Sequence, residues 1–135
     1  MPPTIDSRLL ILVCAVLETG TGLALLAFPR WVVRLLLGAE LQGAGPAAGR
    51  LCGVALMSLG LACWPERAAT PDRLDRRANR ALLVYNASVA AYLAGLLALG
   101  GDRGILLLPA IALHAVLTAV LARIVMRSRT LNENA

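Results

Sequence analysis

The sequence predicts an all-α fold, a single membrane domain (residues 1–135) of four transmembrane helices with a short interfacial amphipathic helix between helices 1 and 2. Three observations support this. Of the 135 residues, 59% are hydrophobic and 16% charged, whereas soluble domains are about half apolar and about a quarter charged. Apolar stretches long enough to cross a bilayer recur four times. The thirteen basic residues are all arginine and stand mostly between these stretches, which disfavours nucleic-acid binding and is typical of multi-pass membrane proteins.

Helix stop signals separate the four apolar stretches. A membrane span needs about 20 mostly apolar residues, and the sequence places spans at about residues 9–28, 47–64, 81–99 and 105–126. Pro29 and Pro65 follow the first two spans and Gly100 follows the third, as expected where helices end. Pro109 lies near the start of the fourth span, where both a kink and a later helix start are admissible.

The segment after the first span has an amphipathic pattern of its own. Arg30 and Arg34 are four residues apart and share a helical face, while the remaining positions are apolar. Trp31 is suited to headgroup depth. We therefore expect a short helix over residues 30–37 that lies in the membrane interface and ends at Gly38. The alternative is a plain extension of the loop or span.

The distribution of arginines predicts the orientation. Cytoplasmic loops of membrane proteins carry the excess of basic residues. Nine arginines flank one side and four the other, so both termini are expected in the cytoplasm. The connector 66–80 is expected to be solvated and held near anionic lipid by its arginines.

Small residues at helical spacing mark surfaces on which membrane helices can pack. One stripe on the second span contains Gly49, Gly53 and Gly60. A second, on the third span, consists of Ala87, Ala91, Ala94 and Ala98, with Gly95 beside it. Packing within one bundle is the favoured interpretation, and an interface in a homo-oligomer is the alternative.

Two ionisable residues are predicted to lie deep in the membrane. Glu18 is about 15 Å and His114 about 20 Å from the cytoplasmic edge at 1.5 Å per residue. Thr118 follows His114 by one turn, and the third span adds Tyr85 and Asn86. One hypothesis is a polar site that binds a ligand head group or carries a proton. The other is structural, with Glu18 hydrogen-bonded to His114, Thr118 or Asn86 to fix helix register.

Catalytic and metal-binding motifs are missing from the sequence. It has no nucleophile elbow, phosphate loop or zinc motif. Cys14, Cys52 and Cys63 fall within the spans and are interpreted as small apolar core residues. The sequence therefore predicts a protein that is not an enzyme and that holds no metal and no cofactor.

Several short segments carry a family resemblance. They are Glu-Thr-Gly-Thr-Gly-Leu at 18–23, the stretch 29–38, Arg-Leu-Cys-Gly at 50–53, Leu-Gly-Leu-Ala-Cys-Trp at 59–64 and Tyr-Asn at 85–86. With these segments most of the chain resembles uncharacterised small four-helix bacterial membrane proteins of the DoxX-like type. The resemblance implies a four-helix membrane fold in the bacterial inner membrane and no catalytic residue. Some members are similar to membrane subunits of quinone-linked oxidoreductases, which makes a quinone or a lipid the expected ligand.

A second likeness is to small multidrug transporters, four-helix chains with an essential glutamate in the first span. Glu18 occupies a similar place, but the long first loop departs from that compact pattern. Three functional hypotheses therefore stand. The first is a bundle that binds an apolar ligand or membrane partner through Glu18, Asn86 and His114; the second is a proton-coupled transporter or channel using Glu18; the third is a purely structural subunit.

Overall fold

The computed structural model describes residues 7–65, 71–100 and 103–133, and every regular element in these ranges is an α-helix. The helices are α1 (Ser7–Ala27), α2 (Pro29–Leu37), α3 (Gly45–Ala62), α4 (Pro71–Ala98) and α5 (Leu107–Glu133). Of these, α1, α3, α4 and α5 are long and apolar enough to cross a membrane. The predicted fold class is confirmed, and the chain has the architecture of a multi-pass membrane protein.

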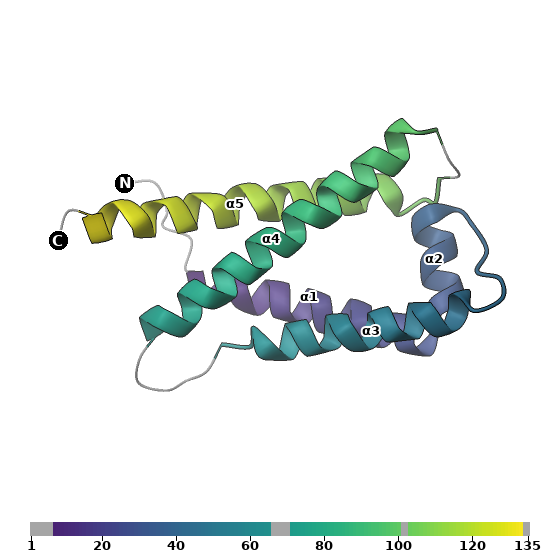
Figure 1. The fold of residues 1–135 in the computed structure, drawn as a ribbon, viewed down its shortest axis with the longest axis horizontal. Helices are drawn as coiled ribbons and strands as arrows, with labels where there is room; N and C mark the ends of the chain where they lie inside the picture. The colour runs from purple at the N-terminus through teal and green to yellow at the C-terminus, as the bar shows by residue number, and fades with distance from the viewer. Residues whose placement is uncertain (1–6, 66–70, 101–102, 134–135) are drawn as a thin grey trace.

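The four long helices form two layers. Helices α1 and α3 pack against each other in one layer and α4 and α5 in the other, with α1 touching α4 between them (Figure 1). Helix α1 is the central span, because 39% of its apolar window is buried, against 17% for α4 and 11% each for α3 and α5. The outward faces carry exposed large apolar side chains such as Leu51, Val84 and Val116. Such faces suit contact with lipid.

The break between α1 and α2 follows from Pro29. A residue before proline is disfavoured in the helical region, and Phe28 has φ −133° and ψ 55°. Pro29 then occupies the start of α2, where its missing N–H costs nothing. At the other end Gly38 adopts φ 75°, and its N–H donates to the Arg34 carbonyl over 2.9 Å. The predicted short helix and its glycine cap are thus confirmed.

Helix α2 lies across the end of the bundle opposite the start of α1 and bridges the two layers (Figure 1). Its last turn docks on the segment that leads into α5, where the Leu106 N–H donates to the Leu35 carbonyl over 2.9 Å. Gly104 has no room for a side chain, since a Cβ there would run into the Leu35 carbonyl oxygen. This close backbone contact ties α2 to α5.

The glycine stripe of α3 packs on α1. A Cβ at Gly53 would lie 2.7 Å from the Gly22 carbonyl oxygen, and one at Gly22 would lie 2.6 Å from the Gly53 carbonyl oxygen. A Cβ at Gly60 would run into Thr19, and one at Gly49 would lie 3.0 Å from the Pro29 Cβ. The intramolecular interpretation of this stripe is confirmed.

The alanine stripe of α4 behaves differently. Ala91, Ala94 and Ala98 are exposed, only Ala87 is half-buried, and nothing lies within 4 Å of a Cβ built on Gly95. The prediction that this stripe packs inside the bundle is wrong, because α4 turns another face, with Leu82, Asn86 and Leu93, toward its neighbours. The subunit-interface alternative for this stripe stays a prediction.

Two helix boundaries also differ from the expectation. Helix α4 begins at Pro71, so the last two thirds of the predicted connector 66–80 are helical, while residues 66–70 lie outside the described ranges. Helix α5 begins at Leu107 and places Pro109 in its first turn, where proline needs no hydrogen-bond partner. Pro109 therefore marks a helix start.

The apolar core occupies the half of the bundle nearer the start of α1. It joins Ile11 and Cys14 of α1 to Leu82 of α4 and to Leu117 and Leu121 of α5. Cys63, directly after α3, completes it. Glu18 follows Cys14 by one helical turn, so the polar residues of the sequence analysis lie directly beyond this core.

Candidate functional site

Five polar side chains from α1, α4 and α5 form one cluster, called here the polar cluster. They are Glu18, Tyr85, Asn86, His114 and Thr118. Glu18 is 3% exposed and Asn86 is fully buried, whereas Tyr85, His114 and Thr118 are half-buried. The cluster therefore has a buried side, called its back, at Glu18 and Asn86, and a partly accessible side, called its front, at Tyr85, His114 and Thr118.

At the back of the cluster, Glu18 of α1 has Tyr85 of α4 as its side-chain hydrogen-bond partner. The expected partners were His114, Thr118 or Asn86. The apolar window of α4 begins at Arg76 rather than near residue 81, which places both Tyr85 and Asn86 at about the depth of Glu18 at 1.5 Å per residue. Asn86 is bonded to His114 instead, so Tyr85 is the α4 side chain that meets Glu18.

Asn86 and His114 join α4 to α5. The Asn86 Nδ2 donates to the Leu82 carbonyl over 2.8 Å, and the Asn86 Oδ1 lies 2.7 Å from the His114 Nδ1. If the Oδ1 and Nδ2 atoms of Asn86 exchanged places, the Asn86 oxygen would lie against the Leu82 carbonyl oxygen, and two acceptors would face each other. Because Oδ1 must then accept, the His114 Nδ1 carries the proton, and in the neutral ring Nε2 is the acceptor.

The front of the cluster is formed by two rings. Tyr85 and His114 meet edge to face, with ring centroids 5.9 Å apart and planes at 77°. Within the described part of the chain, nothing donates to the His114 Nε2. The Thr118 hydroxyl donates to the His114 carbonyl of its own helix over 2.7 Å. A half-buried acceptor is thus available between α4 and α5.

Two cysteines flank the back of the cluster. Cys14 and Cys63 are buried free thiols within electrostatic range of Glu18. The sequence alone puts Cys14 one helical turn from Glu18. It does not show that Cys63, which follows α3, also lies near Glu18. Cys52 is exposed on α3, so its interpretation as a core residue is wrong. Among the described residues, no three His, Cys, Asp or Glu side chains gather as a metal site would require.

Other polar residues near the core stay outside the cluster. Ser58 is exposed and donates to the Val54 carbonyl of its own helix. The Thr19 hydroxyl points toward Gly60 of α3 and, within the described ranges, has no hydrogen-bond partner. Asn79, two turns before Asn86 on α4, is buried, and its Oδ1 also lacks a described partner. Residues 79, 82 and 86 are three and four positions apart, as residues on one helical face are. This spacing in the sequence indicates the face of α4 that is buried.

Comparison with known proteins gives no family for the chain, since no family model, no curated protein and no solved structure matches it. The fold and the geometry of the polar cluster are therefore the basis for a functional proposal.

Proposed function

We propose that this multi-pass membrane protein binds an apolar ligand with a polar head, a quinone or a lipid, or a membrane partner, at the polar cluster. One observation carries the proposal: the half-buried pair Tyr85 and His114 is held from behind by the buried Glu18 and Asn86. Buried polar groups within a membrane are costly and commonly functional. The resemblance to DoxX-like proteins, with their quinone-linked relatives, supports the same ligand class.

The orientation of His114 narrows the chemistry of the ligand. With its Nδ1 proton directed to Asn86, the neutral ring offers a lone pair at Nε2. A hydroxyl donor can bond to this lone pair directly, as the hydroxyl of a quinol or of a lipid glycerol would. A ketone oxygen cannot, because it is itself an acceptor. The site should therefore favour ligands that present a hydroxyl between α4 and α5.

The direct test is to purify the full chain in detergent and identify co-purified quinones and lipids by mass spectrometry. His114→Ala should lower ligand occupancy, and Glu18→Leu, which removes the acceptor of the Tyr85 hydroxyl, should lower it through the loss of Tyr85 positioning. Ser58→Ala, which removes a hydroxyl bonded only within its own helix, is the matched control and should leave occupancy unchanged. Unchanged occupancy in both cluster variants would contradict the proposal.

Proton-coupled transport is the alternative use of the same residues. It rests on Glu18 being deep in α1, and it requires water to reach a side chain that is 3% exposed. Proteoliposomes with an imposed proton gradient separate the two hypotheses. Loss of solute flux in folded Glu18→Gln supports transport, whereas reduced ligand occupancy without any flux supports binding. A purely structural role predicts a stability loss and neither of these effects.

The placement in the cell is part of the proposal. The arginine asymmetry supports an orientation with both termini in the cytoplasm, and the DoxX-like resemblance supports a bacterial inner membrane location. The exposed small-residue stripe on α4 supports a homo-oligomer. Reporter fusions at the C-terminus, active only in the cytoplasm or only outside it, test the orientation, and crosslinking of a cysteine placed at Ala94 tests the oligomer.

A further inference from the structure

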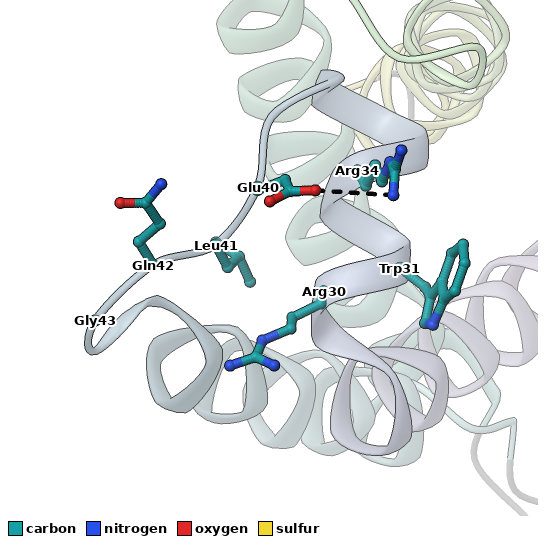
Figure 2. A pocket seen from close by; sticks show the side chains of 7 residues that line it. All are labelled: Arg30, Trp31, Arg34, Glu40, Leu41, Gln42 and Gly43. Atoms are coloured by element: carbon teal, nitrogen blue, oxygen red, sulfur yellow. Dashed lines mark ion pairs between the residues drawn. The ribbon is translucent and has the colours of Figure 1, made fainter.

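The far end of the bundle carries a pocket of about 600 Å³. It lies between α2 and the segment that joins α2 to α3 (Figure 2). Its lining combines two arginines, a glutamate and a tryptophan with a short stretch of loop, namely Arg30, Trp31, Arg34, Glu40, Leu41, Gln42 and Gly43. Sequence reasoning treated the arginines and the tryptophan only as a membrane anchor, since Glu40 joins them only once the chain turns at Gly38.

The charges of the pocket are not satisfied by one another. The Arg34 Nη1 lies 3.8 Å from the Glu40 Oε1, and the two side chains are 61% and 73% exposed. An exposed pair at this distance is weak, so both groups remain able to turn to a ligand. Arg30 has no ion pair or hydrogen bond with any described residue. The pocket therefore offers two cations and one anion.

The depth of the pocket points to the headgroup layer. Helix α2 crosses the ends of the spans instead of continuing them (Figure 1). An amphipathic helix so placed lies along the membrane interface, and Trp31, which is 63% exposed, is a residue typical of that layer. The polar groups nearest to the pocket in a bilayer are thus phospholipid phosphates and the groups they carry.

We infer that this pocket binds the headgroup of an amine-bearing phospholipid, with the phosphodiester on Arg30 and the ammonium on Glu40, which lie at different ends of the pocket (Figure 2). A guanidinium matches phosphate oxygens with paired N–H donors. Glu40, which is only weakly paired with Arg34, supplies the complementary acceptor for an ammonium. A zwitterionic headgroup carries both a phosphate and an ammonium, so it matches a pocket with both cations and an anion better than a headgroup that carries only a phosphate. The inference is independent of the polar cluster and of the function proposed for it.

Tryptophan fluorescence tests it in the full chain. Trp64→Phe leaves Trp31 as the single tryptophan, beside the pocket. The protein is placed in phosphatidylglycerol nanodiscs, and phosphatidylethanolamine, phosphatidylglycerol or diacylglycerol with brominated chains is added at equal mole fraction. Quenching should be strongest for phosphatidylethanolamine and weakest for diacylglycerol, which lacks the phosphate. Equal quenching by all three overturns the inference.

Variants locate the contacts. Arg30→Gln should weaken the apparent binding of brominated phosphatidylethanolamine roughly fivefold, the effect of about one arginine–lipid contact. Glu40→Gln should abolish the preference for phosphatidylethanolamine over phosphatidylglycerol. Arg103→Gln removes the same charge outside the pocket at the same end and should change neither. A loss in Arg103→Gln equal to that in Arg30→Gln means a general charge effect and overturns the site.

Two controls separate local from general effects and a lipid from a soluble ligand. Trp31→Phe leaves Trp64, near the opposite end of the bundle, where quenching should show no headgroup preference and no response to Arg30→Gln. Soluble phosphoethanolamine at millimolar concentration should not relieve quenching at Trp31. Relief by the soluble compound assigns the pocket to free phosphate esters and overturns its assignment to a lipid.

Discussion

In the α1–α3 pair, helix backbones touch directly at Gly22, Gly53 and Gly60. In the α4–α5 pair, contact near the middle of the membrane depends on polar side chains, with His114 bonded to Asn86. Helix α1 takes part in both kinds of contact, since Glu18 reaches Tyr85 of α4 from a neighbouring face of the same helix.

The two helix pairs therefore represent two ways in which helices pack in a membrane. Without a hydrophobic force between helices in lipid, close backbone approach and hydrogen bonds are what remains. The glycine interface leaves no space for a ligand, and its buried hydroxyl, that of Thr19, is enclosed against Gly60. The polar interface contributes less packing but presents ring and hydroxyl groups at its front. Substitutions should therefore affect stability alone in the first interface, and both stability and binding in the second.

The largest expected effect is at the glycine interface. In Gly53→Leu the new side chain starts 2.7 Å from the Gly22 carbonyl oxygen and 2.9 Å from the Leu26 nitrogen. Backbone atoms cannot step aside, so α1 and α3 must separate, at a cost of about 3 kcal/mol or loss of the fold. Unfolding in mixed micelles during titration with dodecyl sulfate measures the loss.

Gly20→Leu is the matched control for this substitution. Gly20 also lies in α1, but a Cβ there meets nothing within 4 Å. Its replacement should change the free energy of unfolding by less than about 0.5 kcal/mol. Equal destabilisation by the two substitutions would show that helix properties, and not the α1–α3 contact, explain the loss.

The two interfaces also differ in how far the sequence predicts them. Spacing of small residues was enough to find Gly49, Gly53 and Gly60, because a glycine stripe on a span has few uses besides packing. Spacing failed for Ala91, Ala94 and Ala98, since alanine is accepted both in an interface and against lipid. All five residues of the polar cluster were found as polar groups in apolar spans. Their pairing was not predicted. A five-residue error in the start of the third span sets Tyr85 and Asn86 about 7.5 Å too close to the membrane edge, and depth alone does not show that Asn86 bonds to His114 and leaves Tyr85 to Glu18.

The next effect in size concerns Asn86. Asn86→Leu removes the acceptor of the His114 Nδ1 proton, and the free energy of unfolding should fall by about 1 to 2 kcal/mol. Ligand occupancy should fall as well, because His114 is no longer oriented. The same micelle titration and mass spectrometry measure the two losses.

Asn79→Leu provides the comparison within one helix. Asn79 is also buried on α4, but its Oδ1 has no partner among the described residues. Replacing an unsatisfied buried polar group with an apolar one is neutral or stabilising. A loss in Asn79→Leu as large as that in Asn86→Leu would mean that side-chain volume on this face, and not the bond to His114, sets the stability.

The smallest effect, and the sharpest comparison, is the coupling between Glu18 and Tyr85. Tyr85→Phe keeps the ring against His114 and removes only the hydroxyl that faces Glu18. A double-mutant cycle with Glu18→Leu, which removes the acceptor, should give a coupling free energy of about 0.6 kcal/mol, the typical value for a side-chain hydrogen bond between membrane helices. Such a small coupling means that Tyr85→Phe should fold well. Under the ligand hypothesis the ligand occupancy of this variant should nevertheless fall below that of the parent protein, because without the bond to Glu18 the ring beside His114 is held less firmly. Full occupancy together with measurable coupling would assign the Glu18–Tyr85 bond to helix register alone. The polar interface would then be as purely structural as the glycine interface.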